Sequence, residues 1–594
     1  MIAACYVRPD CYRDSVFLMR AAQEVRKVRG VLDVGMMMGT PANKRALGAA
    51  RLLTPAAEAA GPSDLIVAVS AESQDAADAA LAAATRHLDS HVSDGGQQAA
   101  DEPCWASLEG AVAADPAANV ALISVPGEYA AAEARRALSR GLNVFLFSDN
   151  VPVAAEIQLK ATGRAVGRLV MGPDCGTAIV DGVPLGFANA VPRGTIGVIG
   201  ASGTGMQAVT CLLARSGMGV SQAIGTGSRD LSSDVGGAST LQALDLLSRD
   251  PATDAVVLVS KVPSPSVADR VVAALAACGK PGVVNFLGYT PAGTGHGELA
   301  FARLLEDVVP AVARLAGVDW PTEPLEYWWS PEDVAGAVQR EREGLAPGQD
   351  LIRGLYSGGT LCQEASLVLS DRGMSPAGAA SVDGSGTASF PARAHCVVDL
   401  GADEFTVGRP HPMIDLSLRS QLMLACAADP RTALVLFDVV LGFGAHPDPA
   451  TQLALAVTAA RARAAADGRR LSFIASVCGT EADPQGLRRS ERTLEAVGVA
   501  VLPTNAQAAR LACLVAGRGL PADDACSVVP WRSSCAPLSA AGRPLFGAPC
   551  RVVNVGLRGF FDTLRAVGAP AVQVDWRPPL GGDPTLASRL AMIL

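Results

Sequence analysis

The 594-residue sequence is poor in lysine, in aromatic residues and in long apolar runs, and each shortage excludes a class of protein. Lysine occurs at five positions, aromatic residues make up 4% of the chain, and no basic run offsets a formal charge of −9. We therefore do not expect a nucleic acid or an anionic membrane as the main partner. Apolar runs such as residues 65–69 are far shorter than the roughly 20 residues that span a bilayer, so no transmembrane helix is predicted.

The sequence also lacks Cys-x-x-Cys pairs and histidines at zinc-finger spacing, although it contains 14 cysteines. Scattered cysteines of this kind are typical of buried thiols in a reducing compartment. Charged residues at Arg8 and Asp10 interrupt the amino end before any apolar core of a secretory signal. We expect a cytoplasmic protein without a metal ion of its own.

A repeating pattern runs through most of the chain: a short apolar run, a glycine-rich turn and an Ala/Leu-rich stretch with helical spacing. This pattern is typical of parallel sheets with crossover helices, so the predicted fold class is α/β. Polar or Pro/Gly-rich breaks mark the boundaries. The predicted segments are residues 1–190, 191–316, 351–520, a linker over 317–350 and a C-terminal tail over 521–594.

The two central segments share landmarks in the same order, which indicates an internal duplication. Ser202-Gly203-Thr204 follows the predicted strand 196–200, and Gly358-Gly359-Thr360 follows the predicted strand 352–357. An Asp-Pro-x-Thr sequence then precedes a later strand in each segment, at Asp250–Thr253 and at Asp429–Thr432. Chance similarity between glycine-rich turns is the alternative.

Both glycine-rich turns are candidate phosphate-binding sites. A turn between a strand and a helix brings backbone N–H groups and the positive end of the helix dipole close to an anion. The absence of a lysine in the turn excludes a Walker A loop, and the spacing is only loosely related to the dinucleotide fingerprint. A purely structural tight turn is the alternative. The predicted phosphate or acyl-phosphate ligands are Gly200, Ser202, Gly203, Thr204, Gly205, Gly358, Gly359 and Thr360.

Several side chains near these turns are candidates for catalysis or substrate binding. Glu364 lies one turn into the second helix, where the first copy has Ala208, so function is expected to be asymmetric between the copies. Arginine pairs with anions in bidentate fashion, and histidine transfers protons near neutral pH. Helix stabilisation, local capping or a solvated loop is the alternative for each. The candidates are Glu364, His296, His411 and Asp415 for catalysis, and Arg229, Asp230 and Arg409 for substrate binding.

With these motifs assembled, the chain resembles the FdrA family, which is related to the succinyl-CoA synthetase superfamily. The turn Gly172–Thr177 (GPDCGT) is similar to a segment of succinyl-CoA synthetase α subunits, and the two helix starts are similar to those that hold phosphohistidine there. The further matching motifs are Tyr12–Ser15, Met38–Thr40 with Asn43-Lys44, Gly200–Gly205, Ser228–Leu231, Asp399–Gly401, Asp403–Thr406, Gly408–Asp415 and Gly479–Gln485.

The resemblance implies a Rossmann-like CoA-binding-type domain, two flavodoxin-like ligase domains and a small C-terminal α/β tail. It implies acyl-CoA ligase chemistry that proceeds through an acyl phosphate, with CoA as a ligand. His296 corresponds loosely to the phosphohistidine of the synthetases. Every segment is already assigned, so we expect no ATP-grasp domain in this sequence.

The same family is also associated with purine-ureide breakdown, where a member resembles a subunit of oxamate carbamoyltransferase. That relationship implies carbamoyl phosphate as a substrate and a hetero-oligomer with partner proteins. Residues 554–561 and 574–579 look like the opening of a partner family found beside FdrA. Three hypotheses therefore stay open: an acyl-CoA ligase, a carbamoyltransferase subunit in allantoin degradation, and a non-catalytic scaffold of such a complex.

Overall fold

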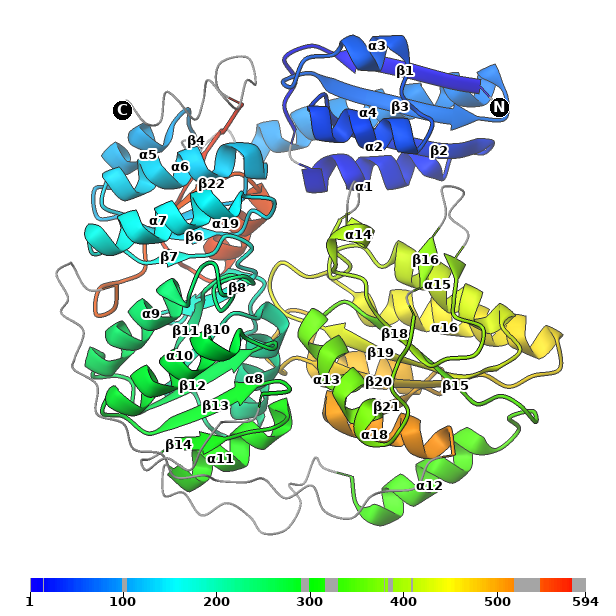
Figure 1. The fold of residues 1–594 in the computed structure, drawn as a ribbon. Coiled ribbons are helices and arrows are strands. Elements are labelled where there is room, and N and C mark those ends of the chain that lie inside the picture. Colours follow the sequence, from blue (N-terminus) through cyan, green and yellow to red (C-terminus); the bar gives the residue numbers. More distant parts are fainter. Residues whose placement is uncertain are drawn as a thin grey trace. The chain divides into compact units, whose positions relative to one another are not determined.

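The structure is a computed structural model with two compact units (Figure 1). It describes residues 2–13, 15–98, 104–289, 299–315, 329–378, 380–382, 388–406, 410–517 and 545–578. Unit 1 comprises Met1–Ala155, Asp403–Pro410 and Arg551–Leu594, and unit 2 comprises Glu156–Ala402 and His411–Cys550. None of the helices within the described ranges is long and apolar enough to cross a membrane.

Unit 1 begins with a small antiparallel sheet. Strands β1 (Ile2–Arg8) and β2 (Val31–Met38) flank β3 (Leu65–Ala71), whose residues are all buried. Alternate β3 side chains serve two cores: Leu65, Val67 and Val69 pack in one core, and Ile66 and Ala68 pack in the other. The helices of this part are α1 (Ser15–Arg26), α2 (Pro41–Ala49), α3 (Pro55–Ala59) and α4 (Gln74–Gln98).

The rest of unit 1 contains a parallel sheet whose strands come from residues 104–146 and 552–574. The strand order is β4 (Cys104–Trp105), β23 (Ala571–Val574), β22 (Val552–Val555), β5 (Val120–Ile123) and β6 (Asn143–Leu146). Its helices are α5 (Leu108–Ala114), α6 (Gly127–Ser139) and α19 (Arg558–Ala566). The buried Trp576 side chain donates a hydrogen bond to Glu133 on α6 over 3.0 Å. The C-terminal segment, which the sequence analysis treated separately, therefore shares a sheet with residues 120–146.

Unit 2 contains two α/β halves. The sheet of the first half has the order β11-β10-β12-β13-β14, and its strands are parallel. The antiparallel pair β8–β9 extends it beyond β11. The elements are α7 (Val153–Ala165), β7 (Val170–Met171), β8 (Thr177–Val180), β9 (Val183–Gly186), β10 (Arg193–Gly200), α8 (Gly203–Arg215), β11 (Val220–Gly225), α9 (Ala238–Arg249), β12 (Ala255–Ser260), α10 (Pro265–Ala277), β13 (Gly282–Phe286), β14 (Leu299–Phe301), η1 (Leu305–Asp307) and α11 (Val308–Leu315).

The second half has a parallel sheet with the order β18-β15-β19-β20-β21. Its elements are α12 (Pro331–Arg342), β15 (Leu351–Tyr356), α13 (Gly359–Asp371), β16 (Ser381–Val382), β17 (Ala388–Ser389), β18 (Cys396–Asp399), α15 (Ser417–Ala428), β19 (Thr432–Val440), α16 (Pro449–Ala466), β20 (Ser472–Cys478), α17 (Leu487–Glu495), β21 (Ala500–Leu502) and α18 (Asn505–Val515). The short helix α14 (Asp403–Thr406) belongs to unit 1.

The two halves of unit 2 share one topology. In each half the strands lie in the order 2-1-3-4-5 by their sequence in that half, which is the flavodoxin-like order. The two Asp-Pro-x-Thr sequences also form the same hydrogen bond: Asp250 and Asp429 each accept one from the threonine hydroxyl three residues later. The predicted α/β class with two flavodoxin-like domains is confirmed.

This topology determines where a ligand site can form. In such sheets the strand order reverses between strands 1 and 3, and ligands bind at the carboxyl ends of those strands. In the first half these strands are β10 and β12, and in the second half they are β15 and β19. Helices α8 and α13, which directly follow β10 and β15, pack against each other (Figure 1). The reversal points of the two halves therefore meet within unit 2.

Candidate functional site

Helix α8 begins with a side-chain cap. Ser202 has extended backbone geometry, and its hydroxyl oxygen accepts a hydrogen bond from the N–H of Gly205 over 3.1 Å. Gly200 keeps the preceding turn tight, because a methyl group at that position would lie 2.5 Å from Cγ of Met206. The buried Ser202 hydroxyl is thus fixed at the start of the helix.

Helix α13 begins differently, with Gly358 as a cap that has no side chain. The carboxylate of Asp438 takes over the capping, since it accepts hydrogen bonds from the N–H groups of Ser357 (2.8 Å) and Gly358 (2.9 Å). Asp438 is fully buried and pairs with the buried guanidinium of Arg419 at 3.1 Å. Burial lowers the pKa of Arg419, and the Asp438 carboxylate opposes that effect.

The two helix starts touch. The hydroxyl groups of Ser202 and Thr360 form a hydrogen bond, and a methyl group on Gly358 would lie 2.9 Å from Cβ of Thr204. Within the described part of the chain, the backbone N–H groups of Gly203 and Thr204 on α8 and of Gly359 and Thr360 on α13 donate no hydrogen bond. The positive ends of the two helices therefore lie against each other and carry free N–H donors, which is a favourable arrangement for an anion.

Lys261 and Asp399 border the start of α13. A methyl group on Gly359 would lie 2.4 Å from Nζ of Lys261 and 2.3 Å from Oδ2 of Asp399. The ammonium and carboxylate groups are 3.7 Å apart. Burial raises the pKa of Asp399, and Lys261 opposes that effect. Lys261 follows β12 directly, so the reversal point of the first half supplies a cation to the helix start of the second half.

His411 lies beside Asp399. A methyl group on Gly401 would lie 2.9 Å from Nε2 of His411 and 3.2 Å from Oδ1 of Asp399. Nδ1 of His411 accepts a hydrogen bond from the N–H of Met413 over 3.2 Å, which assigns the ring proton of the neutral form to Nε2. Desolvation and the nearby Arg419 lower the pKa of His411 to about 4. At neutral pH His411 is therefore an uncharged hydrogen-bond donor.

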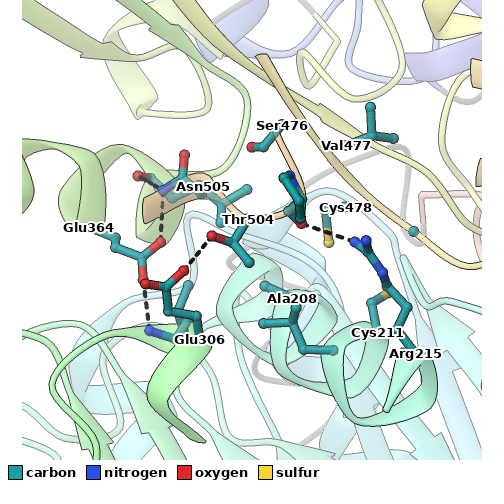
Figure 2. A pocket seen from close by; sticks show the side chains of 15 residues that line it. Ala208, Cys211, Arg215, Glu306, Glu364, Ser476, Val477, Cys478, Thr504 and Asn505 are labelled. Carbon is teal, nitrogen blue, oxygen red and sulfur yellow. Dashed lines mark hydrogen bonds between the residues drawn. The ribbon is translucent and has the colours of Figure 1, made fainter. Parts of the chain in front are cut away.

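Glu364 lines a pocket between α8, α13 and β20 (Figure 2). Its carboxylate accepts hydrogen bonds from the N–H of Leu305 (2.7 Å) and from Nδ2 of Asn505 (2.8 Å). Nearby Glu306 pairs with Arg510. Burial, together with the charge of Glu306, raises the pKa of Glu364 to about 7. Glu364 therefore titrates near neutral pH.

Other predicted site residues have structural contacts. Asp415 accepts hydrogen bonds from the N–H and hydroxyl of Ser417 at the start of α15. Asp230 is fully buried, pairs with Lys160 at 2.7 Å and accepts hydrogen bonds from the first turn of α9. Arg229 pairs with Glu156 on α7 at 3.0 Å. His296 and Arg409 lie outside the described residues.

The sequence analysis did not select Lys261, Asp438 or Arg419. Lys261 was detectable in principle, because it is one of five lysines and follows a predicted strand directly. Asp438 lies inside the apolar strand β19, where sequence alone does not reveal that its carboxylate faces a helix start. Arg419 lies within α15, and no local pattern links it to Asp438.

The described residues offer no metal site. No group of three or more His, Cys, Asp or Glu side chains in those ranges is arranged to hold a metal ion.

Three family models match parts of the sequence. The model described as "AllF, heavy metal-associated domain" matches residues 1–103, and "CoA binding domain" matches residues 193–288. The model described as "CoA-ligase" matches residues 355–515. The last two matches cover the helix starts of α8 and α13.

Similar proteins agree with these matches. The uncharacterized protein YahF of Escherichia coli is 38% identical over 510 residues, which cover 85% of this chain and 97% of that protein. The α subunit of an ADP-forming succinate–CoA ligase from Methanothermobacter thermautotrophicus is 28% identical over 171 residues, 28% of this chain and 57% of the relative. Subunit SauD of an ADP-forming sulfoacetate-CoA ligase from Bilophila wadsworthia is 26% identical over 174 residues, 28% of this chain and 58% of the relative.

Among solved structures, a dinucleotide-forming acetyl-coenzyme A synthetase 1 from Ca. Korarchaeum cryptofilum is 15% identical. The match covers 67% of this chain and 82% of that one, with a TM-score of 0.22. This score is too low to support an argument about the site.

Proposed function

Because the chain belongs to the FdrA family of succinyl-CoA-ligase-like proteins, we propose that it binds an acyl phosphate between the starts of α8 and α13 and takes part in acyl-CoA ligase chemistry. One observation carries the proposal: two helix starts with free N–H groups face each other, and Lys261 lies at one of them. A phosphoryl group placed there would meet backbone donors from both halves and one ammonium group.

The proposed reaction transfers the acyl group from phosphate to the thiol of CoA. The thiol attacks the acyl carbon, the bond between that carbon and the phosphate oxygen breaks, and phosphate leaves. Free N–H groups and Lys261 stabilise the negative charge that grows on the leaving phosphate. Asp399 borders the same space and is the group placed to take the thiol proton. His411, neutral at pH 7, is placed to donate a hydrogen bond through Nε2.

The glycines of the site fit a bulky anion. A methyl group on Gly203 would make a tight contact, 3.2 Å from the Thr177 hydroxyl oxygen. Gly359 has no room for a side chain between the ends of Lys261 and Asp399. We infer that, because these positions carry no Cβ atom, phosphate oxygens of an acyl phosphate or of CoA approach the backbone N–H groups there.

The test is calorimetric titration of the full chain with acetyl phosphate, and separately with CoA. Lys261→Met should weaken acetyl phosphate binding about tenfold, because one ammonium beside a helix N-terminus contributes about 1 kcal/mol or somewhat more. The matched control is Lys27→Met, which removes an exposed lysine paired with Glu24 in unit 1. Equal affinities in wild type and Lys261→Met would contradict the proposed anion site.

A carbamoyltransferase subunit is the second candidate, which the resemblance to the FdrA family implies through the association of that family with purine-ureide breakdown. Carbamoyl phosphate is an acyl phosphate of the same charge, so the same site would hold it. Release of phosphate from acetyl phosphate that depends on CoA supports the ligase. Release from carbamoyl phosphate that depends on an amide acceptor such as oxamate, and not on CoA, supports the transferase. Binding of both phosphates with no transfer, even with partner proteins co-purified from the same pathway, supports the scaffold.

Phosphorylation of His296 stays a prediction. If a phosphohistidine takes part, the wild-type chain incubated with acetyl [³²P]phosphate should carry acid-labile label, and His296→Asn should carry none. Label that is unchanged in His296→Asn would remove this residue from the mechanism.

A further inference from the structure

Two cysteines from different halves of unit 2 meet in the pocket beside Glu364. Cys211 lies in the last part of α8, and Cys478 is the final residue of β20. Both line the pocket, where Figure 2 labels them next to each other, and Cys478 is among the groups that raise the pKa of Cys211. Helix α8 packs against β20, so this contact joins the first half to the second. We propose that Cys211 and Cys478 form a reversible disulfide bond that ties the two halves together.

The difference in exposure between the two thiols suggests the order of events. Cys211 is buried, with 3% of its surface exposed, whereas Cys478 is partly exposed at the pocket. A small oxidant therefore meets Cys478 first. Burial and the neighbouring Cys478 raise the pKa of Cys211, so this thiol holds its proton more tightly than a free cysteine does.

The chemistry balances with hydrogen peroxide as the oxidant. The Cys478 thiolate attacks one peroxide oxygen, the O–O bond breaks, hydroxide leaves, and a sulfenic acid forms on Cys478. The sulfur of Cys211 then attacks that sulfenic sulfur, the S–O bond breaks, and the Cys211 proton leaves with the hydroxyl group as water. Two low-molecular-weight thiols reverse the step by thiol–disulfide exchange.

The surrounding contacts already hold this junction in place. Near Cys211 on α8, Nη1 of Arg215 donates a hydrogen bond to the carbonyl oxygen of Pro503 over 2.9 Å, which also joins the two halves. The hydroxyl of Thr504, the residue after Pro503, donates a hydrogen bond to the carboxylate of Glu306 in the first half. A disulfide would add a covalent link to a junction that packs without it.

The chain offers a matched control pair. Cys396 is among the groups that raise the pKa of Cys426, so the two thiols lie near each other, and both are fully buried in the second half. Neither lines the pocket, and the Cys396 thiol donates instead to the carbonyl oxygen of Gly378 over 3.7 Å. If burial and proximity alone governed oxidation, this pair would react as readily as Cys211 and Cys478.

The experiment treats the full-length wild-type chain with hydrogen peroxide, blocks remaining thiols with N-ethylmaleimide, and maps the cysteines by non-reducing peptide mass spectrometry. We expect a Cys211–Cys478 cross-linked peptide that lacks two hydrogens, disappears with dithiothreitol, and forms equally in Cys426→Ser. In Cys211→Ser, Cys478 should instead be trapped as a sulfenic acid by dimedone. The melting temperature of wild type should rise on oxidation, and that of Cys211→Ser should not.

Three results would overturn the proposal. The first is full recovery of Cys211 and Cys478 as maleimide adducts at a peroxide dose that oxidises a free peptide thiol. The second is cross-linking of Cys396 to Cys426 at the same rate. The third is a Cys478 sulfenic acid that persists in wild type with Cys211 still reduced. None of these readouts depends on acyl-phosphate binding, so the disulfide and the proposed function succeed or fail separately.

Discussion

The starts of α8 and α13 occupy the same place in two halves of the same topology, yet their surroundings differ in charge. Helix α8 is capped by its own Ser202 hydroxyl. Helix α13 has Gly358 at the cap and relies on the Asp438 carboxylate, which is in turn paired with Arg419. Lys261 and Asp399 also lie at α13. The two halves thus share a strand order, while the ionisable groups lie at one of the two helix starts.

The same asymmetry extends one turn further along each helix. The sixth residue of α8 is Ala208 and that of α13 is Glu364, and both line the pocket in Figure 2. An alanine leaves α8 without a titratable group there, whereas Glu364 brings a carboxyl group that is protonated near neutral pH. If the proposed function holds, α8 supplies backbone donors and α13 supplies the groups whose charge can change.

The largest expected effect comes from removing the cation that supports the α13 cap. Arg419→Met should lower the free energy of unfolding by about 3–5 kcal/mol, because it leaves the buried Asp438 carboxylate without its cationic partner. Urea denaturation followed by circular dichroism measures the change. Arg431→Met is the matched control: this arginine forms an exposed pair with Asp350, whose loss should cost about 0–1 kcal/mol.

The corresponding change at α8 is Ser202→Ala, which removes a neutral cap and should cost about 1 kcal/mol. Comparable losses of unfolding free energy for Arg419→Met and Ser202→Ala would mean that the charged groups at α13 stabilise its cap no more than a neutral hydroxyl does. The two helix starts would then not differ in the way argued above.

The next effect concerns the pH dependence that Glu364 confers on the second half. Its pKa rises from 4.5 in the unfolded chain to about 7 in the folded one, so the folded state binds more protons between these values. The contribution of Glu364 to stability is therefore greatest below pH 4.5 and falls as the pH rises to about 7. Over that interval it amounts to on the order of 3 kcal/mol. Glu364→Gln should remove this part of the slope, measured as unfolding free energy at pH 5 and pH 8.

The exposed Glu332 at the start of α12 provides the control for this slope. Glu332→Gln should leave the difference between pH 5 and pH 8 as it is in wild type. An unchanged difference in Glu364→Gln would show that another group carries the pH dependence.

The sequence predicted the backbone of this site better than its charges. Glycine-rich turns after apolar runs located both helix starts, and the repeated Asp-Pro-x-Thr landmarks predicted the duplication, because turn and capping chemistry is local. The charged groups come from elsewhere in the chain: Lys261 contacts a helix start 98 residues later, and Asp438 caps a turn 80 residues earlier. Contacts of this length depend on strand order, which the local pattern did not contain.

The predicted roles of Asp230 and His411 illustrate the same limit. An aspartate in a glycine-rich loop can bind a substrate or cap a buried helix. In the structure Asp230 pairs with the Lys160 ammonium and accepts a hydrogen bond from the first turn of α9. A histidine predicted to transfer protons near neutral pH has a pKa of about 4, because desolvation and Arg419 act on it from outside its own loop. Burial decides both cases, and burial is a property of the assembled fold.

The smallest expected effect on stability gives the sharpest comparison of the two helix starts. Gly359→Ala places a methyl group 2.4 Å from Nζ of Lys261 and 2.3 Å from Oδ2 of Asp399, so these side-chain ends must move. Because they are ends of side chains rather than backbone, the chain should fold with nearly unchanged stability. Gly203→Ala places its methyl group 3.2 Å from the Thr177 hydroxyl oxygen, which needs only a small adjustment.

The two variants should therefore differ in anion binding rather than in folding. Displacing Lys261 should weaken acetyl phosphate binding about tenfold in Gly359→Ala, by the same loss of one nearby ammonium as in Lys261→Met. Gly203→Ala should bind within about twofold of wild type, since a shift of one hydroxyl costs a few tenths of a kcal/mol. In the double variant Gly359→Ala with Lys261→Met the losses should not add, because both changes remove the same contact. Additive losses of affinity in the double variant would mean that Lys261 and the start of α13 act separately on the anion. Equal losses of affinity in Gly359→Ala and Gly203→Ala would mean that the two helix starts are equivalent despite their different charges.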